Sequence, residues 1–409
     1  MAYLELDLTL NEEQRAVQDM AKRFAMEVMR PAGVALDKLS DPADVIAKKS
    51  VLWDVFKKQR ELDLHKTAIS KELGGLAGER DPLTGVLIGE QMGYGDAGLA
   101  ISLGVSNFPF RFAAMSPAPE LQQLARDYCE DTDANLIGCW ALTEPEHGSD
   151  WILAGQRETG NSKCGPSLKA VLKGDEYILN GQKAAWVSNG TIATHAVLHV
   201  GLDVSQGMGA TGIAIVPLDL PGITKGKPLN KIGQRPLNQG EIYFEEVRLP
   251  RQYMLVGEPA MGAYMVQTIL TGANSGMGVL FSGLAQAAFD EALKYAKERV
   301  QGGLPIFEHK NIKLKLFDMF VAVEAARAYV RRMGVYNASN PPGSLQHAIA
   351  GKILATETAF KVTTEAISIF GGNGLSKEYV IEKMFRDARA SMIEDGENSV
   401  LALKGASFF

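Results

Sequence analysis

The sequence of 409 residues contains few of the side chains that build disulfide frameworks or metal sites. Its three cysteines, Cys129, Cys139 and Cys164, are odd in number and form no CxxC pair. This usage predicts a reducing compartment and no disulfide bonds. The six histidines show no HExxH or other ligand pairing, so we expect no metal site.

Long apolar runs and clusters of positive charge are also missing. No apolar run reaches the roughly 18 residues that a membrane-spanning helix needs, so we expect no membrane span. The formal net charge of -6 and the lack of a basic patch argue against nucleic acid as a partner. The acidic N-terminal residues carry no basic leader pattern, and we therefore expect a cytoplasmic protein.

The apolar residues that are present change their spacing twice, which predicts three domains. Residues 1–135 have helical spacing and predict an all-α N-terminal domain. Its first helix is expected to have Asn11 as N-cap and to stop at Pro31. Further helices are expected around residues 42–60, 83–93 and 118–130.

Residues 136–250 approach a period of two and predict a β domain. Asn180-Gly181 is a dipeptide that fits a type I′ turn, so we expect a hairpin there. The segments HAVLHVGL, GIAIVPL and GEIYFEEVRLP are expected to form further strands. Short strands separated by Gly, Pro and Asn are typical of a β-sandwich or barrel.

Residues 251–409 return to helical spacing. Segments 283–300, 310–333 and 345–370 each carry an apolar stripe, which predicts a C-terminal four-helix bundle. The predicted fold class is therefore α+β with several domains, in the order helical domain, β-sandwich or barrel, helical bundle. Ligands often bind where such domains meet.

Four short motifs carry polar or aromatic side chains suited to such a boundary. In CWALTEPEHGSD, the hydroxyls of Thr143 and Ser149 and the N–H groups around Gly148 suit a planar heterocycle; a plain polar loop is the equal alternative. In AAWVSNG, Trp186 stands near Ser188, although a core aromatic is the simpler interpretation.

The other two motifs are weaker when taken alone. Arg299 follows a predicted helix, where a single arginine is usually solvated. IFGGNG contains Gly371 and Gly372 and could be a phosphate-binding loop. Because it follows a helical pattern, a glycine helix C-cap is the preferred interpretation.

Together and in this order, the motifs resemble those of the acyl-CoA dehydrogenase family of flavoproteins. The resemblance covers nearly the whole chain, and ALTEPEHGSD with IFGGNGLSKEYVIEKMFRDAR is a specific combination. It implies a homotetramer that binds FAD between the β domain and the bundle. It also implies acyl-CoA thioesters as substrates and electron-transfer flavoprotein as the usual electron acceptor.

The resemblance further implies which residues contact each ligand. Trp140, Leu142 and Thr143 would lie along the flavin edge, and Trp186 and Ser188 would lie against the ring. Arg299 with Gly371 and Gly372 would meet the adenosine diphosphate part of FAD across a subunit boundary. The remaining expected cofactor contacts are Gly148, Ser149, Ser368 and Glu397, and the expected substrate contacts are Ser149, Asn274 and Asp96.

The segment SMIEDGENSV carries the expected base. Alignment with the family places Asp395 at the catalytic Glu, Glu394 at a Tyr and Glu397 at a Thr. The base removes an α-proton from the thioester while hydride leaves the β-carbon for flavin N5. Because the Asp side chain is one methylene shorter than that of Glu, its carboxylate reaches about 1.5 Å less far towards the substrate. This predicts a branched, cyclic or otherwise non-standard acyl group.

Other interpretations of these residues remain open. Asp395 before Gly396 also fits a helix N-cap, and Asp96 is a further candidate base whose simpler role is capping. Some family members place the base on an earlier helix, but the counterpart near Ala273 has no carboxylate.

Several departures from the family pattern suggest a branch distinct from the straight-chain enzymes. They are Gly302-Gly303 after Arg299, Ser368 before IFGGNG, and a longer loop between residues 150 and 174. The alternative functions are a flavin oxidase similar to nitroalkane oxidase, which also uses an Asp base, and a non-catalytic paralogue that binds flavin or CoA.

Overall fold

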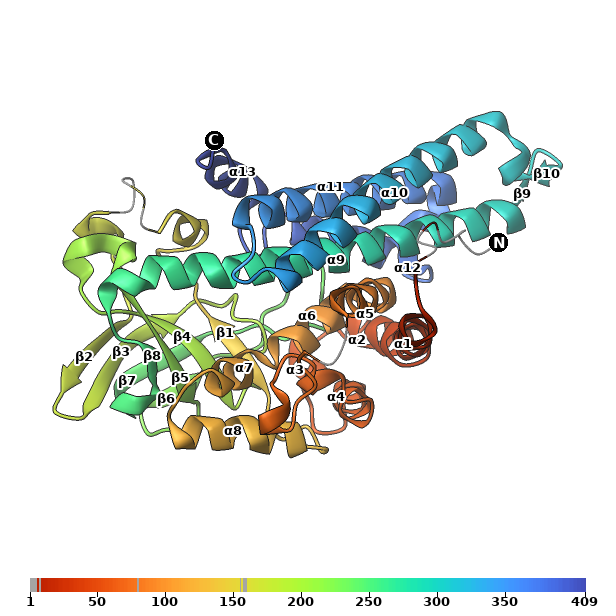
Figure 1. Ribbon diagram of the computed structural model, residues 1–409. Coiled ribbons are helices and arrows are strands. Elements are labelled where there is room, and N and C mark those ends of the chain that lie inside the picture. Colours follow the sequence, from red (N-terminus) through yellow and green to blue (C-terminus); the bar gives the residue numbers. More distant parts are fainter. Residues whose placement is uncertain (1–5, 7–8, 79–80, 155, 157–159) are drawn as a thin grey trace.

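Helices occupy both ends of the chain and a sheet lies between them (Figure 1). The computed structural model describes residues 6, 9–78, 81–154, 156 and 160–409. The order of helical, sheet and helical blocks confirms the predicted fold class. The longer loop after residue 150 includes residues 155 and 157–159, which lie outside the described part of the chain.

The N-terminal block begins as predicted, but helical structure continues past Pro31. Asn11 is the N-cap and forms a capping box with Gln14. A π-helical segment, Phe24–Met29, then leads into a second helix that has Pro31 in its first turn. Proline is tolerated there because it interrupts no established i→i−4 bond, so the predicted stop is wrong. The helices are α1 (Glu12–Arg23), α2 (Arg30–Asp37), α3 (Pro42–Val45), α4 (Val51–Glu61), α5 (Pro82–Gly95), α6 (Ala97–Val105), α7 (Phe108–Ala114) and α8 (Pro119–Glu130).

The middle block is a mixed sheet in two halves, which are joined by one parallel pair, Lys169 with Gly201. One half has the order β6-β7-β3-β2, and the other contains β4, β5 and β8 with β1 beside β4. Side chains from both halves enclose one apolar core. The strands are β1 (Gly138–Ala141), β2 (Lys169–Lys173), β3 (Glu176–Lys183), β4 (His195–Gly201), β5 (Thr211–Pro217), β6 (Ile223–Lys225), β7 (Ile242–Pro250) and β8 (Met254–Val256).

The hairpin predicted at Asn180-Gly181 is wrong. These residues lie inside β3, where the register against β7 shifts. The Asn180 side chain bonds to Glu246 on β7, accepting from its backbone N–H at 2.8 Å. The turn between β2 and β3 instead contains Gly174, whose φ is 64°. The Asn-Gly dipeptide therefore marks a β-bulge.

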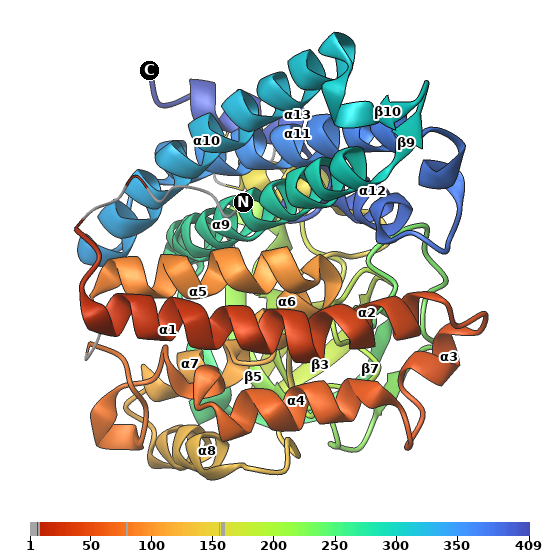
Figure 2. The ribbon, with the colours of Figure 1, turned by 90° about the vertical axis from the view of Figure 1, so that its right-hand side faces the viewer.

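The C-terminal block is built on a single long helix, α9 (Pro259–Glu298), which joins the segment expected at 283–300 to the earlier helix expected around Ala273. Figure 2 shows it between the N-terminal helices and the rest of the bundle. Its glycines lie where neighbours approach closely: a Cβ on Gly283 would lie 2.0 Å from the Glu90 carbonyl oxygen on α5. The other helices are α10 (Lys310–Ser339), α11 (Leu345–Phe370), α12 (Val380–Ser391) and α13 (Asn398–Ala406).

Two short strands, β9 (Val300–Gln301) and β10 (Leu304–Pro305), pair after α9. Within the described ranges, none of the helices is both long and apolar enough to span a bilayer. The cysteines Cys129, Cys139 and Cys164 are free.

Candidate active site

A tight turn between α12 and α13 carries the expected base. Asp395 has a φ of 49° and Gly396 a φ of 107°, both in the left-handed region. A Cβ on Gly396 would lie only 2.3 Å from Cδ1 of Ile152. Glycine is therefore required at position 396, and the turn has little room for another conformation.

Side chains from three other segments hold this turn. Nδ2 of Asn274, on α9, donates to the Asp395 carbonyl at 3.3 Å. Nζ of Lys352, on α11, donates to the Gly396 carbonyl at 2.8 Å. From the β domain, Oγ of Ser149 accepts the Glu397 N–H at 3.0 Å. The turn thus lies where the β domain meets the bundle.

The helix cap in this turn is Glu397. Its Oε2 accepts from the N–H groups of Ser399 at 2.9 Å and Val400 at 3.2 Å, at the start of α13. The alternative that Asp395 caps this helix is therefore wrong, since the chain turns once more before α13 begins. Capping also engages the carboxylate that was expected to contact the cofactor.

The Asp395 carboxylate is half-buried and has no hydrogen-bond or ion-pair partner in the described part of the chain. Its backbone N–H is likewise unpaired among these residues. Burial raises the pKa of the carboxyl group, and the positive charge of Lys352 partly offsets that rise. An unpaired carboxylate with a raised pKa suits a general base.

Substituting Gly396 by Ala is expected to cost most of the activity, because the new methyl group collides with Ile152 and displaces Asp395. A displacement of about 1 Å costs on the order of a hundredfold in rate. The control is Gly104→Ala on α6, where a Cβ would meet nothing within 4 Å. Turnover of both variants, with bound flavin measured by absorbance, checks this; equal activities would contradict it.

A second group of expected residues lies on the β domain. The Ala184 N–H donates to the Thr143 carbonyl at 2.9 Å, which places the two loops side by side. Nε2 of Gln239 donates to the Trp186 carbonyl and to Ser188 Oγ, both at 3.2 Å. The Trp186 side chain is left 59% exposed. An exposed aromatic face beside hydroxyl groups suits a planar ring.

The side chain of Trp140 points into the β domain. Its Nε1–H donates to Nε2 of His199 at 2.9 Å, and burial lowers the pKa of His199 to about 3. The Leu142 carbonyl accepts from buried Lys183 at 3.0 Å, and Lys183 pairs with Glu144 at 2.7 Å. The Trp140 indole N–H is therefore not available to the flavin edge, and any hydrogen bond to that edge must come from backbone groups of this segment.

Four expected cofactor residues lie at the other end of the bundle: Arg299, Ser368, Gly371 and Gly372, all exposed. Here the C-terminal ends of α9 and α11 meet, and Tyr295 stacks on Phe370 with ring centroids 4.0 Å apart. The 12 residues of α12 lead from this end to the Asp395 turn. At 1.5 Å per residue this is about 18 Å. The structure therefore does not bring these residues to the Asp395 site of the same chain.

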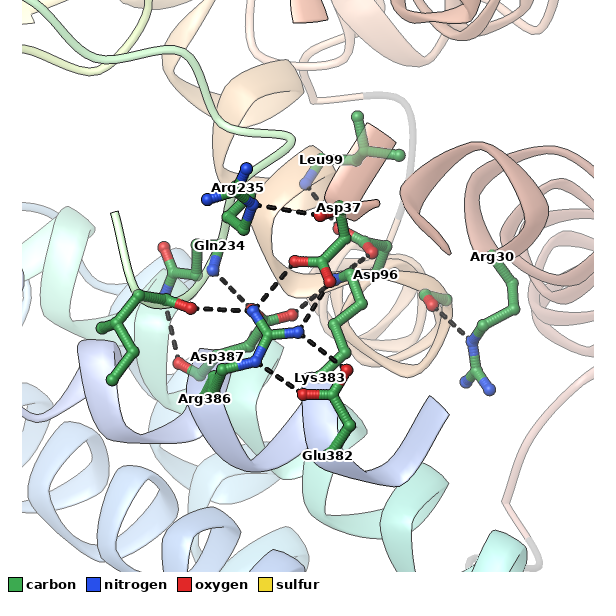
Figure 3. A network of polar contacts seen from close by, with 12 residues as sticks. Arg30, Asp37, Asp96, Leu99, Gln234, Arg235, Glu382, Lys383, Arg386 and Asp387 are labelled. Carbon is green, nitrogen blue, oxygen red and sulfur yellow. Dashed lines mark hydrogen bonds and ion pairs between the residues drawn. The ribbon is translucent and has the colours of Figure 1, made fainter. Parts of the chain in front are cut away.

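Asp96 is a buried capping residue. Its Oδ1 accepts the Leu99 N–H at 2.9 Å, and its Oδ2 lies 2.6 Å from Nζ of Lys383 (Figure 3). Both oxygens are engaged, as the capping interpretation predicted.

Three residues at the site went unnoticed in the sequence: Lys352, Gln234 and Gln239. Lys352 is fully buried on the apolar side of α11, and burial lowers its pKa to about 8. A lysine inside an apolar stripe was the available signal. Gln234 and Gln239 lie in a loop before β7 and gave no pattern.

Comparison with known proteins agrees with this geometry. Models described as the N-terminal, middle and C-terminal domains of acyl-CoA dehydrogenase match residues 11–112, 139–247 and 260–407. A probable acyl-CoA dehydrogenase of Bacillus subtilis is 34% identical over 97% of this chain and 98% of that protein. The chain belongs to the acyl-CoA dehydrogenase family.

Two further relatives show how far the likeness extends. Cyclohex-1-ene-1-carbonyl-CoA dehydrogenase of Geobacter metallireducens is 30% identical over 96% of both chains. The structure of butyryl-CoA dehydrogenase from Megasphaera elsdenii superposes with a TM-score of 0.84 at 27% identity, covering 98% of this chain and 99% of that one. Members of the family are FAD-dependent oxidoreductases that act on CH–CH bonds.

The residues present fit a flavin. A Cβ on Gly148, Gly371 or Gly372 would meet nothing within 4 Å, which leaves open backbone at both ends of the expected FAD path. Oδ1 of Asn274, beside the base, is buried without a partner in the described residues. Those residues contain no group of three or more His, Cys, Asp or Glu side chains placed to bind a metal ion.

Proposed function

We propose that this protein is an acyl-CoA dehydrogenase that uses Asp395 as its base and acts on a branched, cyclic or otherwise non-standard acyl group. The observation that supports this most is the unpaired, half-buried Asp395 carboxylate, in a turn held by Asn274, Lys352 and Ser149. The proposed FAD site extends from Thr143, Trp186 and Ser188 towards Arg299 and Gly371 of another subunit.

The proposal gives each group of the turn a distinct task. The Asp395 carboxylate takes the α-proton, and its raised pKa makes it a stronger base than an exposed Asp. The unpaired Asp395 N–H donates to the thioester oxygen, where negative charge develops. Bound FAD would supply the hydride acceptor. Asn274 and Lys352 keep the turn in place.

The short side chain supports the choice of substrate. Asp reaches about 1.5 Å less far than Glu, so the α-carbon must lie closer to the turn. We propose that a bulky or cyclic acyl group places its α-carbon there. The relative named for a cyclic thioester shows that such substrates occur in the family, and we propose the same class here.

Anaerobic titration of the purified flavoprotein with straight, branched and cyclic acyl-CoAs tests the proposal. Bleaching of the flavin band by branched or cyclic thioesters is the expected result. A yellow protein that no thioester reduces, and that reoxidises rapidly in air after reduction by a nitroalkane, would indicate the oxidase instead. A colourless protein would indicate a non-catalytic paralogue.

We further propose a homotetramer, with electron-transfer flavoprotein as the acceptor. An apolar face of α10 supports self-association, since Leu314, Phe317 and Val321 are 67%, 62% and 51% exposed at helical spacing.

Phe317→Asp is expected to shift the protein to smaller species in analytical ultracentrifugation, because it places a charge in the interface. Leu172→Ser, at an exposed site on β2, is the control. An unchanged distribution for Phe317→Asp would contradict this interface.

A further inference from the structure

A second carboxylate stands beside the proposed base. Glu394 is half-buried, and its Oε2 accepts a hydrogen bond from Nε2 of Gln234 at 2.7 Å. Its Oε1 has no hydrogen-bond or ion-pair partner in the part of the chain that the structure describes. One oxygen of Glu394 is therefore fixed, and the other is free for a ligand.

A buried polar network holds the group that fixes Glu394. Gln234 is fully buried, and its backbone N–H donates to Oδ1 of Asp387. Oδ2 of Asp387 lies 2.6 Å from Lys383, which also pairs with Asp96 at 2.6 Å (Figure 3). These contacts join α5–α6, the loop before β7 and α12. Gln234 thus has little freedom to follow another position of Glu394.

Glu394 is linked both to the base and to the loop that holds the proposed flavin surface. It directly precedes Asp395, and the charges of the two groups interact. Lys231, on the loop before β7, also acts on Glu394 through its charge and donates to Oε1 of Gln239 at 2.8 Å. Gln239 in turn holds Ser188. A substrate whose reacting carbons lie between Asp395 and the flavin therefore passes close to Glu394.

We propose that the free oxygen of Glu394 accepts a hydrogen bond from the substrate, so that the enzyme prefers acyl groups that carry a hydroxyl or amino donor. This inference rests on the proposed function and specifies its substrate class. A purely aliphatic acyl chain would cover a carboxylate without giving it a partner, which is unfavourable. Burial raises the pKa of Glu394 to about 7, so a partner that donates a hydrogen bond also restores the ionised form.

A role for Glu394 that is only structural predicts something different. If Glu394 served only to satisfy Gln234, its removal would lower stability and would affect all substrates alike. If it were a second base, its loss would slow every substrate. A contact with the acyl group instead changes the ratio between substrates, because only the substrates with a donor lose an interaction.

Matched pairs of thioesters distinguish these roles. The pairs are isovaleryl-CoA with 4-hydroxyisovaleryl-CoA, and cyclohexanecarbonyl-CoA with 4-aminocyclohexanecarbonyl-CoA. For each thioester, the second-order rate constant of anaerobic flavin reduction is measured. The variants are Glu394→Gln, which keeps the shape, and Glu394→Tyr, which restores the residue that the family carries. Glu245→Gln, exposed on β7, is the matched control. Visible absorbance and circular dichroism confirm bound FAD and fold.

The native protein is expected to prefer the donor-bearing member of at least one pair by about 10- to 100-fold, the worth of a hydrogen bond to a charged group. Both Glu394 variants should reduce that ratio towards one, while Glu245→Gln keeps it. Equal rates within both pairs in the native protein would overturn the inference and leave the proposed function intact. A preference that survives both substitutions would also overturn it. If no thioester reduces the flavin, the proposed function fails and this inference falls with it.

Discussion

Replacing Asp395 by Asn is expected to stop flavin reduction by acyl-CoA while FAD remains bound. Asn has nearly the same shape, and the backbone contacts of the turn to Asn274 and Lys352 do not involve the exchanged atom. An amide cannot accept the α-proton, and a positioned general base contributes about 10²–10⁴-fold to the rate. Anaerobic stopped-flow measurement of flavin bleaching gives this loss directly.

The pH profile provides a second measure of the same substitution. The base must be ionised, so the rate of reduction falls as the pH falls through the pKa of Asp395. Because burial raises that pKa, the acidic limb should lie above the ordinary value of 3.8 for Asp. The residual reaction of Asp395→Asn should lack this limb.

The control for this substitution is Glu357→Gln, which removes a carboxylate from an exposed position on α11. It should keep full activity and the native acidic limb. If Asp395→Asn reduces its flavin within a few-fold of the native rate, another group is the base. Glu394, the neighbouring carboxylate, would then be the first residue to test.

The order of domains was predictable because it depends on the periodicity of apolar residues, which is local information. Local turn chemistry was less reliable. Asn180-Gly181 commonly forms a hairpin turn, but here Asn180 bonds across a bulge to Glu246. Pro31 commonly ends a helix, but here a π-helical segment precedes it and Pro31 lies at the start of a new helix. The close packing of Gly283 on α9 against Glu90 is visible only in the structure, because the two residues are far apart in the sequence.

The candidate site was predictable to the extent that it is carried by motifs. SMIEDGENSV and CWALTEPEHGSD meet through the hydrogen bond from the Glu397 N–H to Ser149 Oγ. The residues that hold this site come from elsewhere: Lys352 and Gln234 are 44 and 160 positions from the groups they bond. No local pattern specifies a partner at such a separation, so these supports required the structure.

Replacing Lys383 by Met is expected to cause a large loss of stability. The Lys383 side chain is 5% exposed and lies 2.6 Å from carboxylate oxygens of both Asp96 and Asp387. Met has similar bulk but no charge, so it leaves two buried carboxylates facing each other without a cation. Breaking a buried ion pair in this way costs about 3–5 kcal/mol. Denaturant unfolding, followed by circular dichroism, measures the change in the free energy of unfolding.

The loss should depend on pH with a definite sign. Burial raises the folded-state pKa of Asp387, and Lys383 partly offsets that rise while Asp96 adds to it. Removing Lys383 is therefore expected to raise this pKa further. A raised folded-state pKa means that stability is retained at low pH and is lost as the pH rises through that value. The free energy of unfolding of Lys383→Met should therefore lie further below that of the native protein at pH 8 than at pH 5.

Two comparisons separate this effect from a general loss of lysine. Lys377→Met, at an exposed site before α12, should change stability little. Adding Asp96→Asn to Lys383→Met removes one of the two stranded charges, so part of the lost stability should return. A loss below about 1 kcal/mol for Lys383→Met would mean that the ion pairs of Lys383 contribute no more than ordinary surface salt bridges. Because Asp387 also holds Gln234, the ion pair would then be too weak to explain how Glu394 is kept in position.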